Sequence, residues 1–264
     1  MRPLFACWSD IAARLASSRM VALFLDFDGT LAAIQPRPEL VRVHPDLRRT
    51  LAELACNPRL RLWVVSARRR ADIRARVRVP AARYLGLYGW ERRCLPRPQP
   101  GPITCVKEIL AATLLPLPAV WIEDKQYTFA VHYRGAPEEV RSLVAERVHR
   151  AVEPWRADLR IAPGKCVWEI APRRLSDKGA AVRRELARLG GGVLPVYVGD
   201  DLSDEAAFAV LPQRGVGIRV GGAGRTRAHY RLDSSQQVHW FLEKLRAELL
   251  SPPATAPLRS RLGE

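Results

Sequence analysis

The fold of this chain is decided by the stretch Val21-Ala22-Leu23-Phe24-Leu25-Asp26-Phe27-Asp28-Gly29-Thr30-Leu31. Its five apolar residues predict a buried strand, and two carboxylates follow where the strand ends in a Gly-Thr turn. Because side chains alternate along an extended segment, we expect Asp26 and Asp28 to point the same way at the carboxyl edge of a sheet, where open α/β sheets bind ligands. Two like charges held this close require a divalent cation or a shared proton.

Length and composition set the limits. The chain has 264 residues and is 48% hydrophobic, which suits one large domain or a main domain with a smaller insert. No apolar run approaches the roughly 20 residues of a membrane span, and Asp10 interrupts the first segment before a signal-like stretch develops. The five cysteines are scattered without metal-ligand spacing, which indicates reduced packing thiols. We expect a cytoplasmic protein that contacts no membrane.

The formal net charge of +16 raises the question of a nucleic-acid partner. The arginines are spread along the chain without interleaved aromatic residues or a basic tail. We interpret them as a solvated, arginine-rich surface that secondarily steers anions, and nucleic-acid binding is the minor alternative.

Strand-like and helix-like segments alternate at both ends of the chain, which predicts a mostly parallel sheet covered on both faces. In the first part we expect strands at 21–25, 61–65 and 83–88, and helices at 44–56 and 69–77. In the last part we expect strands at 195–198 and 215–220, the latter as the last strand, and helices at 177–189 and 235–250. Ser176 is the expected N-cap of the 177–189 helix, and Ser203 that of a further helix. Residues 251–264 are expected to form a frayed tail.

The middle of the chain has a different pattern. Four prolines in residues 94–102 exclude a helix or a central strand there, so we predict a linker. After it we expect helices at 103–115 and 137–152, and strands at 119–123, 127–133, 158–162 and 166–170. A helix followed by a hairpin, twice over, predicts a small α+β insert with an antiparallel sheet.

A second acidic group, Gly199-Asp200-Asp201-Leu202-Ser203-Asp204, follows another predicted strand. Aspartates near a helix start are often simple caps that stabilise the helix dipole. Beside Asp26 and Asp28, however, they supply hard oxygen ligands from neighbouring strand ends. This combination predicts a Mg²⁺ site that leaves room for water and a phosphate oxygen.

Ser66 and Lys178 are the other candidates for chemistry. Ser66 ends the strand at 61–65 and is either an ordinary N-cap or a hydroxyl directed at a phosphate oxygen. Lys178 lies in the first turn of a predicted helix, where the dipole disfavours a cation. It is therefore either a solvated lysine or the partner of an anion.

These elements, in this order, resemble the haloacid dehalogenase superfamily of phosphotransferases, and the resemblance covers most of the chain. The chain is more closely similar to the trehalose-6-phosphate phosphatases, through residues 24–31, 64–68, 131–134, 164–170, 177–180 and 197–205. The His-Tyr-Arg segment at 132–134 and the Gly-Lys-x-Val-x-Glu segment at 164–169 are the more specific of these.

The resemblance implies an α/β fold with a Rossmann-like core, formed by residues 1–93 and 174–264, and an inserted α/β cap of residues 94–173. It implies a Mg²⁺-dependent phosphomonoester hydrolase of trehalose biosynthesis that converts trehalose 6-phosphate to trehalose and phosphate through an aspartyl-phosphate. Because cap residues choose the sugar, another sugar-phosphate or glycosyl-glycerate phosphatase is the alternative. A non-catalytic module that has kept the fold is a further one, and the oligomeric state is not predicted.

The resemblance also implies residue roles. Asp26 would be the nucleophile, Asp28 the general acid and base, and Lys178 a catalytic residue that holds the phosphoryl group with Ser66. Mg²⁺ would be held by the Asp26 carboxylate, the Asp28 carbonyl and Asp200, supported by Asp201 or Asp204. The implied substrate-binding residues are Thr30, Ser66, Arg68, Glu123, Lys125, His132, Arg134, Lys165 and Glu169. Glu169 is open to a second interpretation, as a surface pair on a hairpin.

Overall fold

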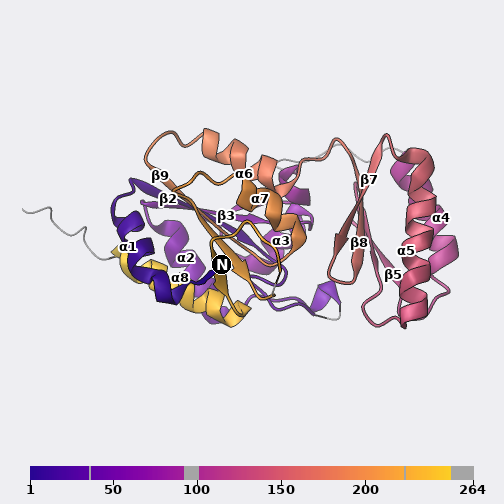
Figure 1. The fold of residues 1–264 in the computed structure, drawn as a ribbon, viewed down its shortest axis with the longest axis horizontal. Coiled ribbons are helices and arrows are strands. Elements are labelled where there is room, and N and C mark those ends of the chain that lie inside the picture. Colours follow the sequence, from indigo (N-terminus) through magenta and orange to yellow (C-terminus); the bar gives the residue numbers. More distant parts are fainter. Residues whose placement is uncertain (36, 92–100, 223, 251–264) are drawn as a thin grey trace, which may run out of the picture.

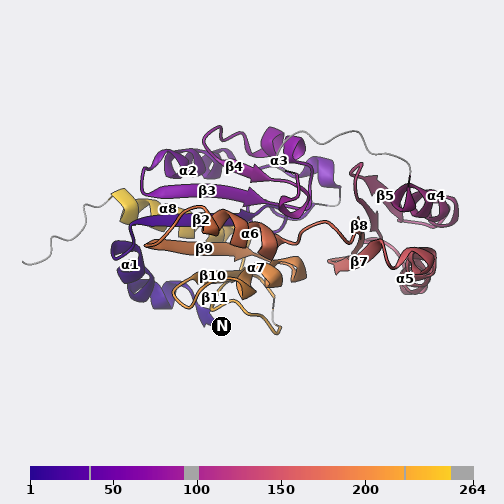
Figure 2. The ribbon, with the colours of Figure 1, turned by 90° about the horizontal axis from the view of Figure 1, so that it is seen from above.

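The structure is a computed structural model and describes residues 1–35, 37–91, 101–222 and 224–250. Within these residues the strands form one sheet of seven strands and one of four. The two sheets lie toward opposite ends of the long axis of the molecule (Figures 1 and 2). The larger sheet is built from both ends of the chain and the smaller one from its middle.

The large sheet is parallel throughout and has the strand order β1-β11-β10-β9-β2-β3-β4, which Figure 2 shows from β4 to β11. This confirms the predicted α/β fold with a mostly parallel sheet. The strands are β1 (Arg2–Pro3), β2 (Met20–Asp26), β3 (Leu60–Val65), β4 (Arg83–Leu85), β9 (Val193–Gly199), β10 (Val216–Val220) and β11 (Tyr230–Leu232).

Helices cover both faces of this sheet (Figure 1). Four helices pack on one face of the sheet and share a hydrophobic cluster with it: α1 (Trp8–Ala16), α2 (Pro45–Cys56), α3 (Arg70–Val77) and α8 (Ser235–Leu250). Two others, α6 (Lys178–Ala187) and α7 (Glu205–Ala209), pack on the opposite face. Burial on both sides explains why the central strands are almost continuously apolar.

The prediction that the strand at 215–220 is the last one was wrong. Tyr230–Leu232 adds a further parallel strand beside β10, and Arg2–Pro3 pairs with it at the edge of the sheet. Strands of two and three residues are too short to show a periodic pattern. Strand β4 ends at Leu85, earlier than predicted, because Leu87 and Tyr88 have positive φ values of 48° and 59° and turn the chain.

Both predicted serine N-caps were also wrong. Asp177 caps α6, where its Oδ1 atom accepts a hydrogen bond of 2.7 Å from the Ala180 amide. Asp201 caps the short 3-10 turn Leu202–Asp204 in a capping box with Asp204. In both cases an aspartate lies next to, or two residues before, the serine, and the anionic side chain is the favoured partner of a helix start.

The small sheet is antiparallel, as predicted, with the order β5-β6-β8-β7. Its strands are β5 (Trp121–Asp124), β6 (Phe129–His132), β7 (Leu159–Gly164) and β8 (Val167–Pro172). Helices α4 (Pro102–Leu114) and α5 (Glu138–Val152) cover its outer face, and their apolar residues share one core cluster with it. The other face of this sheet is turned toward the large sheet (Figure 1).

Two predicted segments fall largely outside the described residues. These are the linker at 94–102, of which only the last two residues are described, and the tail at 251–264. Cys7, Cys56, Cys105 and Cys166 are free thiols. In the part of the chain that the structure describes, none of the helices has the length and apolar character of a membrane span.

Candidate active site

The alternation of side chains along β2 continues past the end of the strand. One set of side chains packs in the hydrophobic cluster on one face of the sheet: Val21, Leu23, Leu25 and Phe27. Ala22 and Phe24 pack on the opposite face of the sheet. Asp26 and Asp28 continue this second series, and both line one cavity of about 310 Å³.

Neighbouring strands bring further polar groups to the same place. Strands β3 and β9 flank β2 in parallel, so the carboxyl ends of all three strands meet at one edge. Asp26 is paired with Val65 on β3, which places Ser66 just beyond it. Gly199 ends β9, and Asp200 follows at once. Ser66 and Asp200 both line the cavity.

A buried group of charges lies at this edge, and we call Asp26, Lys178, Asp200 and Asp204 the core cluster. Carboxylate oxygens of its three aspartates lie within 4.8 Å of one another. The Lys178 Nζ atom donates to Asp26 Oδ1 at 2.7 Å and to Asp204 Oδ1 at 2.8 Å. Asp204 Oδ1 also accepts a hydrogen bond of 2.6 Å from the Tyr197 hydroxyl. Lys178 is thus the partner of buried anions, and the solvated-lysine alternative is wrong.

The core cluster has too little positive charge for its carboxylates. Burial raises the pKa of Asp26 well above its ordinary value, and the charges of Asp204 and Asp200 add to this effect, while Lys178 opposes it. Burial also raises the pKa of Asp200, against the opposing effect of Lys165. Burial lowers the pKa of Lys178, but Asp204 and Asp26 outweigh it and raise that pKa well above normal. The Lys178 ammonium group therefore stays charged, whereas the ionised forms of Asp26 and Asp200 are disfavoured.

The geometry of the core cluster fits a hard divalent cation. Asp200 Oδ1 is buried and has no hydrogen-bond partner in the described residues. Two glycines leave the space that the carboxylates occupy: a Cβ atom at Gly29 would lie 2.2 Å from Asp200 Oδ2, and one at Gly199 would lie 2.3 Å from the Asp204 carboxyl carbon. Carboxylate oxygens are the ligands that Mg²⁺ prefers, and one of these oxygens is left without a hydrogen-bond partner in the described residues.

The five residues predicted to hold the metal do not all have the same surroundings. Asp26, Asp200 and Asp204 lie together. Asp204 is completely buried, and its Oδ2 atom accepts a hydrogen bond of 2.8 Å from the Asp201 amide, so it supports the cluster from behind the cavity. Asp201 lines the cavity but its carboxylate caps the following turn. The Asp28 carboxylate binds Arg68.

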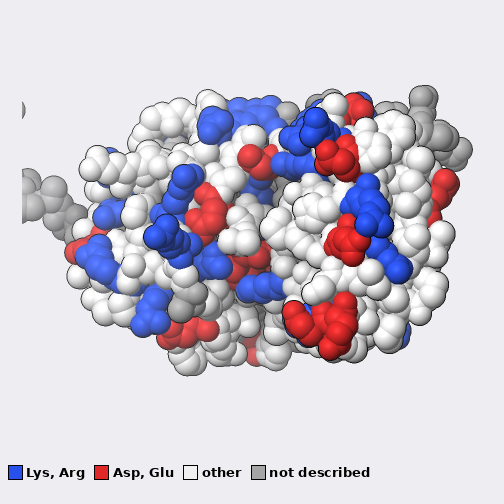
Figure 3. All heavy atoms as spheres, turned by 45° about the vertical axis from the view of Figure 1, so that its right-hand side comes forward, with Lys and Arg blue, Asp and Glu red and all other residues white. Residues whose placement is uncertain are grey.

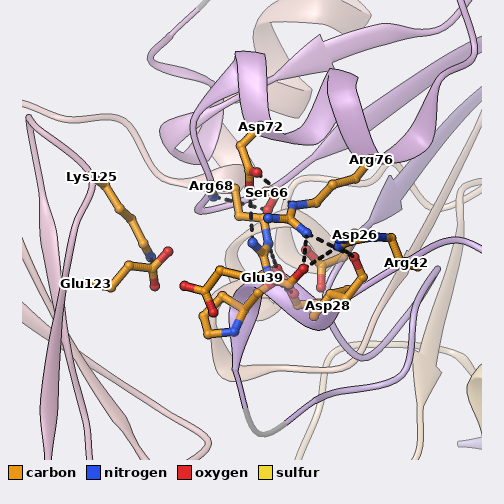
Figure 4. Close-up of polar contacts among 12 residues, drawn as sticks. Asp26, Asp28, Glu39, Arg42, Ser66, Arg68, Asp72, Arg76, Glu123 and Lys125 are labelled. Carbon is orange, nitrogen blue, oxygen red and sulfur yellow. Dashed lines mark hydrogen bonds and ion pairs between the residues drawn. The ribbon is translucent and has the colours of Figure 1, made fainter.

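Arg68 binds both carboxylate oxygens of Asp28, with distances of 2.8 Å from Nε to Oδ2 and from Nη2 to Oδ1 (Figure 4). Its side chain is 6% exposed, whereas that of Asp28 is 38% exposed. The Ser66 hydroxyl oxygen accepts a hydrogen bond of 3.1 Å from the Arg68 amide, which leaves the hydroxyl hydrogen free to be donated elsewhere. Ser66 does not cap α3, whose N-cap residue is Arg69.

The small sheet contributes to the same cavity through one of its faces. Val131 and Ile170 belong to the hydrophobic cluster that this sheet shares with α4 and α5, and Ile122 packs against it. The alternate residues line the cavity instead: Trp121, Glu123, His132, Ala162, Gly164, Val167 and Glu169. Because the strands are paired in antiparallel register, Trp121 lies opposite His132, and His132 opposite Val167. Period-two alternation therefore separates the face that lines the cavity from the face that packs against the helices.

Four polar residues of this face form a second group, which we call the cap cluster: Glu123, Lys125, His132 and Glu169. Lys125 Nζ donates to Glu169 Oε1 at 2.5 Å and lies 3.7 Å from Glu123 Oε2. His132 Nε2 lies 3.0 Å from Glu123 Oε2, and its ring stacks on Trp121 with the ring centroids 3.9 Å apart. Glu169 is therefore part of a buried pair in the cavity, and the surface-pair alternative is wrong.

In the cap cluster, the Glu123 carboxylate and the Lys125 ammonium group stabilise each other's charge. Burial raises the pKa of Glu123, but the hydrogen bond with His132 and the charge of Lys125 outweigh it and lower that pKa to about 2. Burial lowers the pKa of Lys125, and the charges of Glu169 and Glu123 outweigh it and raise that pKa. Both partners are thus held in their charged forms by each other.

The turn between β7 and β8 connects the two clusters. Lys165 lies in this turn, and its ammonium group forms an ion pair with Asp200 Oδ2 of the core cluster. The carbonyl of Lys165 accepts a hydrogen bond of 2.9 Å from Arg134 Nη2. Both side chains line the cavity.

Most of the predicted site residues therefore line one cavity. The exceptions are Asp204, which lies behind it, and Thr30, which is fully buried with a hydroxyl that has no partner in the described residues. Trp121 and Tyr88 line the cavity but were not predicted. Trp121 precedes Glu123 by two residues, so strand alternation alone would have found it.

The cavity has two chemically different ends. One end offers carboxylates and an ammonium group, which suit a metal cation and a phosphate group. The other offers donors and acceptors held in mutual pairs beside an aromatic ring, which suit a polyhydroxylated molecule. Figure 3 shows acidic and basic side chains on both sides of the hollow between the two parts of the molecule.

Comparison with known proteins identifies a family. The family model of the trehalose-phosphatases matches residues 24–236. Trehalose-phosphate phosphatases of Mycobacterium tuberculosis and Mycobacterium bovis are 34% identical to this chain, and the match covers 90% of the chain and 64% of those proteins. Trehalose-phosphate phosphatase B of Arabidopsis thaliana is 30% identical over 87% of the chain and 67% of its own length. The chain thus spans about 64% of the length of its mycobacterial relatives.

Solved structures agree on the fold. The C-terminal domain of the trehalose-6-phosphate phosphatase of C. albicans superposes with a TM-score of 0.79, at 21% identity, over 90% of this chain and 96% of that domain. A trehalose-6-phosphate phosphatase related protein superposes with a TM-score of 0.69 at 20% identity, over 86% of this chain and 97% of that one. At this level of identity the likeness establishes the fold alone.

Proposed function

The chain belongs to the trehalose-phosphatase family, and from this membership we propose that it hydrolyses trehalose 6-phosphate to trehalose and inorganic phosphate. The observation that carries the proposal is that one cavity joins the core cluster, where burial raises the pKa of Asp26, to the cap cluster, where His132 and Lys125 lower the pKa of Glu123. A phosphate ester of a neutral sugar matches both ends.

We assign the chemical steps to residues of the core. The Asp26 carboxylate attacks the phosphorus atom, and the bond between phosphorus and the sugar oxygen breaks as Asp28 protonates that oxygen. Trehalose leaves, and Asp26 carries the phosphoryl group as an acyl phosphate. Asp28, now ionised, then takes a proton from a water molecule that attacks the phosphorus, which releases phosphate and restores both carboxyl groups.

Other residues hold the phosphoryl group during transfer. The Lys178 ammonium group lies at 2.7 Å from Asp26 Oδ1 and can follow the charge as it moves onto the phosphoryl oxygens. The Ser66 hydroxyl lines the same end and has its hydrogen available. Asp26 and Asp200 would hold Mg²⁺, with the Asp28 carbonyl as a third ligand, and the ion would neutralise charge on the phosphoryl oxygens.

We further propose that residues 1–93 and 174–264 form the catalytic core and residues 94–173 a cap that supplies the sugar-binding groups. The cap cluster, with Arg134 and Lys165, would bind the glucose hydroxyls and exclude bulk water from the phosphoryl group. The enzyme would act in the cytoplasm, which its four described free cysteines support.

Substrate profiling tests this proposal. Phosphate release is measured for a panel of sugar phosphates, including glucosylglycerate-type esters, with Mg²⁺ and with a chelator. We expect trehalose 6-phosphate to have the highest kcat/KM and chelation to abolish turnover. Good Mg²⁺-dependent activity on another ester, without activity on trehalose 6-phosphate, would overturn the substrate and keep the reaction class. Absence of activity on every ester would overturn the enzymatic proposal.

A further inference from the structure

We propose that Arg68 is a positioning residue for Asp28 rather than a ligand of the sugar. We also propose that Asp72 and Arg76 couple this pair to the loop of residues 38–41, which contains the short 3-10 helix Pro38–Leu40. The inference rests on the proposed function, because it concerns the residue assigned there as the general acid and base. It also replaces the role in substrate binding that the sequence suggested for Arg68.

The first argument is the number of hydrogen-bond donors that Arg68 has left. A guanidinium group has five N–H donors. Nε and Nη2 bind Asp28, Nη1 binds Asp72 Oδ2 at 2.9 Å, and Nη2 also binds the Pro38 carbonyl at 3.2 Å. Four donors are thus engaged within the protein. The guanidinium also lies 5.4 Å from the centroid of the Phe27 ring, so little of it is left for a sugar hydroxyl.

The second argument is the geometry of the contact with Asp28. Two parallel N–H···O bonds fix the plane of a carboxylate as well as its position, which a lysine cannot do. Asp28 needs such support because it lies beyond the end of β2, with its side chain 38% exposed. In the proposed second step Asp28 acts as a carboxylate that must lie within hydrogen-bond distance of the attacking water, so a fixed orientation has direct catalytic value there.

The third argument is that hydrogen bonds lead from Arg68 through Asp72 and Arg76 to the loop that lines part of the cavity. Asp72, bound to Arg68 through one oxygen, accepts a hydrogen bond of 2.7 Å from Arg76 Nε through the other. Arg76 Nη1 donates to the carbonyls of Val41 at 3.0 Å and Glu39 at 3.2 Å (Figure 4). Pro38 and Val41 line the cavity. The loop is held through its backbone carbonyls, so its position is linked to that of the Asp28 carboxylate.

The test separates positioning from binding by measuring kcat and substrate affinity independently. Arg68→Gln and Arg68→Lys are made in the active protein for kcat with trehalose 6-phosphate. The same substitutions are made in the Asp26→Asn variant, which cannot form the acyl phosphate, and the Kd for trehalose 6-phosphate is measured by calorimetry. Arg49→Gln, which removes an exposed arginine on α2 paired with Asp46, is the matched control.

For a positioning residue, we expect Arg68→Gln to lower kcat by about 10- to 100-fold while the Kd changes by less than about threefold. Arg68→Lys restores part of the loss in kcat. Arg76→Gln removes the contacts of Arg76 with Asp72 and with the loop but leaves Arg68 bound to Asp28, so it lowers kcat by about two- to fivefold. The Arg76 variant also keeps the test available if Arg68→Gln does not fold, which circular dichroism reveals.

A rise of about tenfold or more in the Kd with kcat unchanged would show that Arg68 binds the sugar and would overturn the inference. An unchanged kcat in all three variants would overturn it as well. Failure of the proposed function is a separate result: the wild-type protein would then not hydrolyse trehalose 6-phosphate, and the same comparison would be made with the ester that it does hydrolyse.

Discussion

The core cluster and the cap cluster both bring acidic and basic side chains to one cavity, but the pKa values of their acids are shifted in opposite directions. In the core cluster the pKa of Asp26 and that of Asp200 are raised by burial. In the cap cluster burial acts in the same direction on Glu123, but its partners lower the pKa to about 2. The difference lies in the neighbouring groups: Asp26 has the carboxylates of Asp204 and Asp200 beside it as well as Lys178, whereas the neighbours that shift the pKa of Glu123 are His132, Lys125 and Arg68, all of which lower it.

This contrast shows how one cavity can serve two kinds of chemistry. A cluster that is short of positive charge is costly in isolation and gains from any cation that enters it. A cluster whose acids are paired with hydrogen-bond donors gains less from an added ion, and its paired groups can exchange hydrogen bonds with neutral hydroxyls. The same chemical change, a carboxylate replaced by an amide, should therefore affect the two clusters differently.

The largest effect is expected for Asp26→Asn in the core cluster. Because we propose Asp26 as the nucleophile, we expect this variant to lose at least about a thousandfold in kcat/KM. The melting temperature in a chelator at pH 7.5 should rise by about 2–4 °C, which corresponds to ~1 kcal/mol. The sign follows from the pKa of Asp26: a raised folded-state pKa favours the protonated form, so the stability it gives is present at low pH and lost as pH rises. Asparagine carries no such cost.

Phosphate release and a thermal melt check both parts of this prediction. Asp124→Asn is the matched control, because Asp124 is an exposed partner of Lys107 in the small sheet, and it should change neither quantity. Retained turnover in Asp26→Asn would remove the nucleophile assignment. A fall of several degrees in the melting temperature would mean that the core cluster is not short of positive charge.

Addition of Mg²⁺ is the next largest effect and acts on the core cluster alone. At a concentration of 100 times the Kd, a ligand that binds only the folded state stabilises it by about 2.7 kcal/mol. We expect Mg²⁺ to raise the melting temperature of the wild-type protein, and Asp200→Ala to abolish most of that rise. Glu169→Gln in the cap cluster should leave the rise intact. Equal loss in both variants would contradict a metal site confined to the core.

The core cluster follows closely from the sequence. An apolar run that ends in acids predicts both a strand and the edge where its last residues lie, so Asp26, Asp200 and Ser66 could be placed in one site without coordinates. The alternation of hydrophobic residues likewise predicts the antiparallel sheet of the cap.

Other features depend on contacts that no local pattern encodes. The pairing of Asp28 with Arg68 joins residues 40 positions apart, and nothing near either residue specifies it. Strand β11 is three residues long and is defined only by its neighbours. The choice of Asp177 over Ser176 as a helix cap depends on where the preceding chain leaves β8, because both residues have a suitable side chain.

A smaller effect, of the opposite sign to that in the core, is expected for Glu169→Gln. Lys125 is 6% exposed, and Glu169 is its closest anionic partner. Loss of that charge leaves a buried ammonium group less well compensated, which should lower the free energy of unfolding by about 1–3 kcal/mol. Urea unfolding measures the change, with Glu108→Gln on the exposed side of α4 as the control. A stabilised Glu169→Gln variant would remove the distinction between the two clusters.

The smallest effect is the pH dependence that Glu123 gives to the cap cluster. Its folded-state pKa of about 2 lies below the ordinary value of 4.5, so its contribution to stability is present above pH 4.5 and is lost as pH falls toward 2. Between pH 5.5 and pH 4 the wild-type protein should lose about 1 kcal/mol more than Glu123→Gln does. Urea unfolding of both proteins at the two pH values measures this difference. If the two lose stability equally, the Glu123 carboxylate is not stabilised by His132 and Lys125, and the contrast between the two clusters fails for this residue.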